Sequence, residues 1–153
     1  MTIGVLSDTH GLLRPETLQT LAGVSHILHA GDVGDAAILD ALALIAPVTA
    51  IRGNIDRVGP CAALPATELI ELGGTSFYLV HDVHDLDLDP VAAGIAVVVS
   101  GHSHKPRIEW RRGVMYLNPG SAGPRRFSLP LTVARVSLSD GLPRAEIVDL
   151  HSQ

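Results

Sequence analysis

Two histidines follow an apolar run in VVVSGHSHKP, which covers residues 97–106. His102 and His104 are two positions apart, and Asp8 and His10 in LSDTHG have the same spacing after another apolar run. In an extended segment, residues i and i+2 lie on the same side of the chain. We therefore predict that each pair converges on one point, where imidazole and carboxylate groups bind a metal ion.

Three further polar residues end strand-like runs: Asp32 in HAGDV, Asn54 in RGNID and His81 in LVHD. Parallel strands in an α/β sheet bring ligands together at their carboxyl ends. The predicted metal ligands at this edge are Asp8, His10, Asp32, Asn54, His81, His102 and His104. Nitrogen and oxygen donors without a thiolate suit Mn²⁺, Fe, Ni²⁺ or Zn²⁺, of which we favour Mn²⁺. Seven ligands exceed one tetrahedral site, so we predict two metals about 3.5–4 Å apart that share a carboxylate.

Glycines come directly before three of these ligands. Gly31, Gly53 and Gly101 precede Asp32, Asn54 and His102. Glycine permits turns that other residues resist, and it lets two backbones approach closely. The predicted arrangement is therefore a set of rigid buried strands that end in tight turns, with the ligands facing a common point.

Each motif taken alone has an ordinary structural interpretation, because short motif matches often mislead. The order of the motifs along the chain favours a metal site instead. We interpret His29 as a core histidine rather than a partner that orients Asp32. Two roles stay open for Asp56, which either orients Asn54 or stabilises the turn.

An acidic stretch follows His81. Asp85, Asp87 and Asp89 resemble the start of a calcium loop, but Pro90 and Ala96 replace the glycine and the glutamate that such a loop needs. We therefore interpret this stretch as a solvated acidic loop near the mouth of the site.

The segments that must position the ligands alternate between two types in the first third of the chain. Strands are predicted at 2–7, 25–30 and 47–52, and helices at 14–23 and 35–46. This order predicts a parallel sheet with right-handed crossovers.

The second half of the chain is dominated by hairpins. They are predicted at 66–81, 107–118 and 131–150, and residues 91–100 are predicted to form a helical turn followed by a buried strand. A parallel half followed by an antiparallel half predicts two sheets packed face to face, with helices outside.

Composition limits the class of protein. The chain has 153 residues, of which 46% are apolar, so we expect one folded domain over residues 1–153. The net charge of −5 and the lack of a basic run argue against nucleic-acid binding, and we interpret Arg125 and Arg126 as solvated, with phosphate contact as the alternative. The single Cys61 allows no internal disulfide, and no apolar run reaches the ~20 residues of a membrane helix. We expect a soluble, cytoplasmic protein and leave a homo-oligomer open.

The motifs SDTHG, HAGDV, RGNID, LVH, SGHSH and LNPGS resemble, in order, those of the calcineurin-like metallophosphoesterases. The likeness covers about Ile3 to Ser121 and is strongest to the small bacterial and archaeal phosphodiesterase branch. It implies a four-layer α/β/β/α sandwich of two mixed sheets flanked by helices, which holds a dinuclear metal centre.

The resemblance also implies roles for individual residues. Asp32 bridges two metals, and the catalytic residues are Asp32, Asn54 and His102. One metal is held by Asp8, His10, Asp32 and His104, and the other by Asp32, Asn54, His81 and His102. A small phosphate ester is the implied substrate, attacked by a hydroxide that the two metals activate.

Two positions depart from the family pattern. Many members have a histidine where this chain has Ile55, and that histidine is thought to protonate the leaving group. Many also have a glycine where this chain has Asp82. We therefore predict a phosphodiesterase, with a phosphomonoesterase on the same centre or a non-catalytic protein-binding scaffold as the alternatives.

Overall fold

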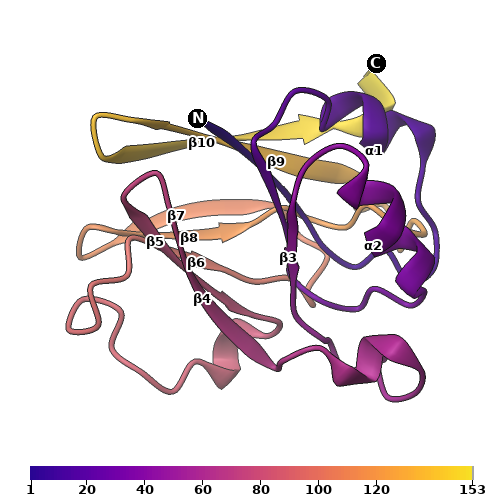
Figure 1. Ribbon diagram of the computed structural model, residues 1–153, viewed down its shortest axis with the longest axis horizontal. Helices are drawn as coiled ribbons and strands as arrows, with labels where there is room; N and C mark the ends of the chain where they lie inside the picture. The colour runs from indigo at the N-terminus through magenta and orange to yellow at the C-terminus, as the bar shows by residue number, and fades with distance from the viewer. Residues whose placement is uncertain (153) are drawn as a thin grey trace.

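Two five-stranded sheets pack face to face in the computed structural model, which describes residues 1–152 (Figure 1). The first sheet has the order β10-β9-β1-β2-β3. Its strands are β1 (Thr2–Leu6), β2 (His26–His29), β3 (Val48–Ala50), β9 (Thr132–Ser139) and β10 (Leu142–Asp149). The three N-terminal strands are parallel, as predicted, and the β9–β10 hairpin joins β1 in antiparallel orientation.

Two short helices connect the parallel strands. α1 (Pro15–Thr20) has Pro15 in its first turn, where the missing N–H costs nothing, and α2 (Ala36–Ala43) is capped by Asp35, whose Oδ1 accepts from the Ala37 N–H at 2.9 Å. Both helices begin where the sequence predicts. Both end several residues earlier than predicted, because the chain turns there toward the next strand.

The second sheet has the order β4-β5-β6-β8-β7. Its strands are β4 (Thr67–Leu72), β5 (Thr75–Val80), β6 (Val97–Val99), β7 (Arg107–Arg111) and β8 (Val114–Asn118). The predicted hairpins are present, but β6 pairs in parallel with both β5 and β8. The second sheet is therefore mixed, as the family resemblance implied, and the antiparallel pairing expected for this half holds for the hairpins alone, since the long crossover at 81–96 returns the chain in the direction of β5.

The main core lies between the sheets. Ile3, Val5 and Leu28 of the first sheet pack with Phe77 and Met115 of the second, and all five are buried. Alternate residues of the first sheet, among them Leu6 and Ile27, point the other way and pack under α1 and α2.

The outer layers of the sandwich are built from different elements. The two helices cover the first sheet, as the four-layer prediction requires. The second sheet is covered by the 81–96 segment, in which Leu88 and Ile95 pack against Val98. That segment contains the short 3₁₀ helix η2 (Val83–Asp85), and two further 3₁₀ helices are η1 (Pro60–Ala63) and η3 (Leu150–Ser152).

Five strands, β1, β2, β3, β5 and β6, end at the same side of the sandwich, and the loops that follow them carry every predicted ligand. No helix in residues 1–152 combines the length and the apolar character that crossing a bilayer requires.

Candidate metal centre

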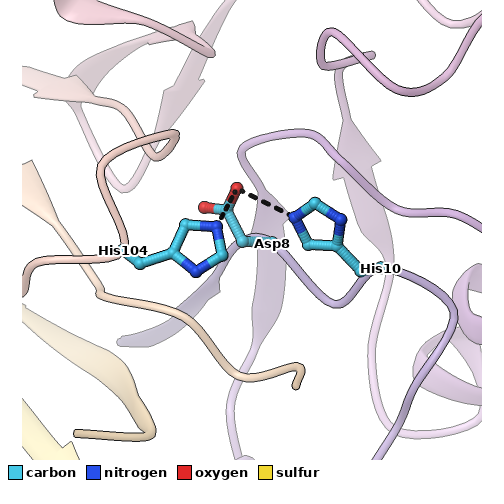
Figure 2. Close-up of side chains that lie close together, drawn as sticks. All are labelled: Asp8, His10 and His104. Atoms are coloured by element: carbon cyan, nitrogen blue, oxygen red, sulfur yellow. Dashed lines mark ion pairs between the residues drawn. The ribbon is translucent and has the colours of Figure 1, made fainter. Parts of the chain in front are cut away.

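The first group of ligands comes from the loops after β1 and β6. Asp8 Oδ1 lies 3.4 Å from His104 Nε2 and 3.7 Å from His10 Nε2 (Figure 2). The two imidazole rings flank the carboxylate, with centroids 5.3 Å apart. Asp8 and His104 are buried, and His10 is partly exposed. The spacing of two residues thus accompanies convergence for Asp8 and His10, whereas His104 joins this group without His102, so the prediction that both pairs converge is wrong for the second pair.

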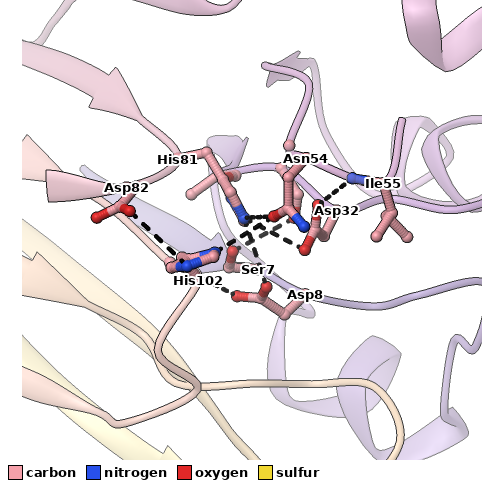
Figure 3. A network of polar contacts seen from close by, with 12 residues as sticks. Ser7, Asp8, Asp32, Asn54, Ile55, His81, Asp82 and His102 are labelled. Carbon is pink, nitrogen blue, oxygen red and sulfur yellow. Dashed lines mark hydrogen bonds and ion pairs between the residues drawn. The ribbon is translucent and has the colours of Figure 1, made fainter. Parts of the chain in front are cut away.

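The second group comes from the loops after β2, β3, β5 and β6. Asn54 Oδ1 lies 3.1 Å from His81 Nε2 and 3.3 Å from His102 Nδ1, and Asp32 Oδ2 lies 3.2 Å from His81 Nε2 (Figure 3). Asn54 and His102 are exposed, whereas Asp32 and His81 are buried. The Asn54 and His102 side of this group therefore faces the solvent, and the Asp32 and His81 side faces the interior.

Asp32 lies between the two groups. Its Oδ2 is 3.4 Å from His10 Nε2 of the first group and 3.2 Å from His81 Nε2 of the second. Its Oδ1 accepts the Ile55 N–H at 3.0 Å, which fixes the carboxylate in this orientation. Asp8 also reaches toward the second group, with Oδ1 3.9 Å from His81 Nε2. All seven predicted ligands thus come together around two neighbouring carboxylates.

The turns that carry the candidate ligands have a left-handed backbone conformation, which the sequence did not predict. Asp8, His10, Asp32, His102 and His104 all have positive φ, between 46° and 70°. The prediction that each pair sits on an extended segment is therefore wrong, and left-handed turns bring the side chains together. Such conformations are costly for residues other than glycine and collect at functional sites.

Two glycines of the site are required because a neighbouring segment packs directly against their backbone. A Cβ at Gly101 would lie 2.6 Å from Asp8 Oδ2 and would collide with Ser7 Oγ, although Gly101 itself has no positive φ. A Cβ at Gly53 would collide with Asp32 Oδ1. At both positions, any side chain would displace a carboxylate of the centre.

The structure shows which of its two possible roles Asp56 has. Its carboxylate accepts three backbone N–H groups, from Gly53 at 2.9 Å, Gly34 at 3.0 Å and Val33 at 3.1 Å. It therefore ties the loop of Asp32 to the loop of Asn54 and stabilises the turn, without contacting the Asn54 side chain.

Asn118, at the end of β8, was not identified from the sequence as a site residue. Its Nδ2 donates to Gly101 O at 3.0 Å and to Ser103 Oγ at 3.2 Å, and its Oδ1 accepts the Gly120 N–H. These contacts hold the turn that carries both histidines of SGHSH. The motif LNPGS marks Asn118 as a polar residue at a strand end, but its partners in the SGHSH turn lie 15 to 17 positions away and cannot be identified from the sequence.

His29 is a satisfied core histidine, as interpreted from the sequence. Its Nδ1 accepts the Gly31 N–H at 3.1 Å, so Nε2 carries the proton and donates to Thr9 Oγ1 at 3.0 Å. Burial lowers the pKa of His29 to about 4, because the charged imidazolium cannot be solvated there. It supports the backbone beneath the ligands without contacting a ligand side chain.

The two carboxyl groups of the centre have lowered pKa values, which favours the binding of a cation. Burial opposes ionisation of Asp8, but the imidazoles of His10 and His104 outweigh it and hold its pKa well below its usual range. Asp32 likewise has a lowered pKa, because His81 and the Ile55 N–H outweigh burial. Both carboxylates are therefore ionised at neutral pH.

The lone pairs of the donor atoms point toward the middle of the centre, as the binding of a metal requires. His81 Nδ1 donates to Ala30 O at 2.7 Å, so in the neutral ring Nε2 is a lone pair aimed at the oxygens of Asp32 and Asn54. Asp8 Oδ1 and His10 Nε2 are buried and have no hydrogen-bond partner within residues 1–152. Electron pairs that converge without donors between them are what a bound cation satisfies.

Asp82 stands beside the exposed histidine. Its Oδ2 lies 3.7 Å from His102 Nε2, on the opposite side of the ring from Asn54. A carboxylate there favours the proton on Nε2 and leaves Nδ1 free to ligate. Asp82 thus adds an outer contact at the position where many family members have glycine.

Two segments do not join the centre. Arg125 and Arg126 are exposed and line neither of the two hollows that flank the site. Asp85 and Asp87 line one hollow near Asn54, which agrees with an acidic loop at the mouth of the site. Ile55 is 41% exposed beside Asp32.

Residues 1–141 match the family model of the calcineurin-like phosphoesterase superfamily domain. The chain belongs to this family. It is 35% identical to a probable metallophosphoesterase of Methanocaldococcus jannaschii, over 93% of this chain and 78% of that protein. Members of the family bind divalent metals and act on phosphate esters. The prediction that this chain is a calcineurin-like metallophosphoesterase is therefore confirmed.

Solved structures agree on the fold of this phosphoesterase family member. An archaeal phosphodiesterase superposes with a TM-score of 0.79 at 21% identity, covering 97% of this chain and 100% of that chain. Vps29 of Entamoeba histolytica in complex with zinc superposes with a TM-score of 0.74 at 23% identity, covering 98% and 99%. Both likenesses establish the metallophosphoesterase fold.

Proposed function

We propose that this chain hydrolyses phosphate diesters with two divalent metals, of which Mn²⁺ is the favoured ion. The observation that carries the proposal is the position of Asp32 Oδ2, 3.4 Å from His10 Nε2 and 3.2 Å from His81 Nε2, between two groups of donors. Asp8, His10, Asp32 and His104 would hold one metal, and Asp32, Asn54, His81 and His102 the other.

When bound, two such metals stabilise charge on the phosphoryl oxygens and provide a hydroxide nucleophile at neutral pH. The residues of the chain would position the substrate and limit the net negative charge of the site. Asn54 contributes a neutral oxygen, which limits the negative charge that an anionic diester meets. His102, whose side chain is 46% exposed, lies at the entrance and would contact the phosphoryl group.

Ile55 supports the preference for diesters. It lies beside Asp32 with an apolar side chain, where many relatives have a histidine that acts as an acid. An alkoxide leaving group needs a proton, and general acid catalysis typically contributes about 10²–10⁴-fold. Without that proton donor, singly charged diesters with good leaving groups are the better substrates.

The test uses chelator-treated protein reloaded with Mn²⁺, with bis(4-nitrophenyl) phosphate and 4-nitrophenyl phosphate as substrates. We expect two metals per chain by elemental analysis and a higher kcat/KM for the diester. Faster turnover of the monoester would favour a phosphomonoesterase on the same centre. Two bound metals without turnover of either ester would favour a protein-binding scaffold, which the complete ligand set makes the weaker alternative.

The variant Ile55→His sharpens this test. An imidazole at that position should raise monoester kcat/KM by at least about tenfold while metal content stays the same, because it restores a proton donor near the leaving oxygen. The matched control is Ile55→Gln, which is polar but is no acid. Equal monoester rates in the two variants would contradict the role assigned to this position.

A further inference from the structure

Two hollows meet at the candidate centre and share Asp82 and His102. One, of about 440 Å³, extends past Asn54 and His81 toward Asp85. The other, of about 580 Å³, extends over the outer face of the second sheet, between the 82–86 segment and β7. Both volumes lie within the range of small-molecule sites. A diester has two alcohol groups that diverge from phosphorus, and each hollow has room for one.

The hollows differ in charge. The smaller one is lined by three carboxylates, Asp82, Asp85 and Asp87, against one guanidinium, Arg52. We call it the acidic hollow. The Arg52 guanidinium is partly engaged by the backbone, because its Nη1 donates to Leu64 O at 2.7 Å.

The larger hollow, which we call the basic groove, has the opposite balance. Lys105, Arg107 and Arg111 line it together with Glu109 and Asp82. Glu109 pairs with both arginines, at 2.9 Å to Arg111 Nε, and it neutralises one of them. Among the ion pairs of residues 1–152, none includes Lys105.

The basic groove is also built to hold its cations in place. Arg111 lies over the Tyr116 ring, with Cζ 4.9 Å from the centroid, and the ring forms part of the floor. The register places Glu109 opposite Tyr116 and Arg107 opposite Asn118, so these side chains lie on one face of the β7–β8 hairpin. In a chain with a net charge of −5, this groove is a local site of positive potential next to the metal ligands.

We propose that the substrate is a phosphodiester in which one alcohol carries a second anionic group, and that the basic groove binds this group. The other alcohol, uncharged, occupies the acidic hollow. Lys105 and Arg107 act as specificity residues, and neither takes part in bond cleavage. The inference rests on the proposed diesterase function and adds the class of substrate.

The test uses three synthetic diesters, each a 4-nitrophenyl butyl phosphate with a terminal phosphate, carboxylate or hydroxyl group. The Mn²⁺-loaded protein should prefer the charged compounds by about tenfold in kcat/KM, since an exposed ion pair contributes only a few-fold and several act together. A faster phosphate arm identifies a second phosphate as the recognised group, and equal charged arms identify any anion. Equal rates for all three compounds would overturn the proposal.

Two matched charge reversals locate the effect. Lys105→Glu should remove most of the preference, measured as the ratio of kcat/KM for the charged compounds to kcat/KM for the hydroxyl compound. Arg144→Glu changes the net charge equally on an exposed position of β10, outside both hollows, and should keep the preference. The same loss in both variants would mean that net charge alone causes the preference, which would overturn the groove.

A binding measurement separates this proposal from the proposed function. Calorimetry with butane-1,4-diol bisphosphate and with butyl phosphate does not depend on turnover. Tighter binding of the bisphosphate, lost in Lys105→Glu, supports the groove even if no diester is hydrolysed. Equal binding of the two compounds overturns the groove even if diesters are hydrolysed.

Discussion

The two ligand groups of the centre are built differently. Asp8 and His104 lie almost completely buried between loops, whereas Asn54 and His102 are exposed at the entrance. Burial keeps the first group in one geometry, and exposure leaves the second group open to substrate. For the two metals proposed above, this difference predicts that the first would be retained more firmly than the second.

The largest effect is expected where the two groups meet. Asp32→Ala should reduce diester turnover by more than about 10³-fold and weaken both metals, because its Oδ2 faces both groups. Asp35→Ala, in the same loop, is the control, since it removes a helix cap worth about 1 kcal/mol and leaves turnover unchanged. Elemental analysis and diester assays measure both. An Asp32→Ala protein that keeps two metals would show that the carboxylate does not bridge.

The second comparison uses the two histidines of one motif. His104→Ala should abolish retention of the first metal during dialysis, because a buried position has no water that replaces the imidazole easily. His102→Ala should keep the first metal and weaken the second by more than the roughly 10–100-fold that loss of an outer partner costs. Metal content at limiting Mn²⁺ distinguishes the two. Identical losses in the two variants would mean that burial does not separate the groups.

Asp56→Ala tests what holds the second group to the first. The variant leaves three buried or partly buried N–H groups without their carboxylate, and we expect a loss of about 3 kcal/mol in the free energy of unfolding. Asp56→Asn keeps one acceptor oxygen and should lose less. Urea denaturation of the metal-free proteins measures both. A change below about 0.5 kcal/mol would show that the loops hold each other without Asp56.

His29 makes the buried support sensitive to pH. Its folded pKa of about 4 lies below its ordinary value of 6.5, so the unfolded chain binds more protons in this range, and stability falls as pH decreases from 6.5 toward 4. The neutral His29 contributes up to about 3 kcal/mol to the free energy of unfolding above pH 6.5. The charged groups nearest His29 are Asp8, Asp56, His81 and Asp32, and the variant keeps all four, so the difference between the two proteins reports chiefly on His29.

The matched variant is His29→Asn, which offers an oxygen to the Gly31 N–H and does not titrate. Urea denaturation of the metal-free proteins at pH 7, 6 and 5 should show a shallower decline for the variant. Parallel declines would mean that His29 is not neutral in the fold.

The smallest effect belongs to the exposed support. Asp82→Gly should weaken the second metal by about tenfold and leave the first unchanged, since the carboxylate is 3.7 Å from His102 Nε2 and partly solvated. Asp87→Gly removes a nearby exposed carboxylate and is the control. Calorimetric titration with Mn²⁺ compares them. Equal affinities in the two variants would remove Asp82 from the centre.

The convergence of the candidate ligands at one edge could be predicted from the sequence because each candidate follows an apolar strand in a fixed order. Asp32 and His81, for example, come directly after buried runs, and strands of one sheet end together. The same logic predicted the hairpin turns and the order of helices, since these depend on local patterns of apolar and turn residues.

The supporting contacts could not be predicted in this way. Asp56 bonds to residues 22 and 23 positions away, and Asn118 bonds to a turn 15 to 17 positions away, so no local pattern reveals them. The parallel placement of β6 between β5 and β8 also depends on which long crossover packs best. Contacts of this kind exist only after the sheets have formed.

The sequence by itself determined which donor atoms this protein has and that strand ends would bring them to one edge. Only the tertiary structure decided that His104 is buried and His102 exposed, although the two lie two residues apart in one motif. It also decided that left-handed turns, rather than extended segments, aim the ligands. The physical reason is that composition and periodicity specify local conformation, whereas burial and charge at a point depend on every segment that packs around it.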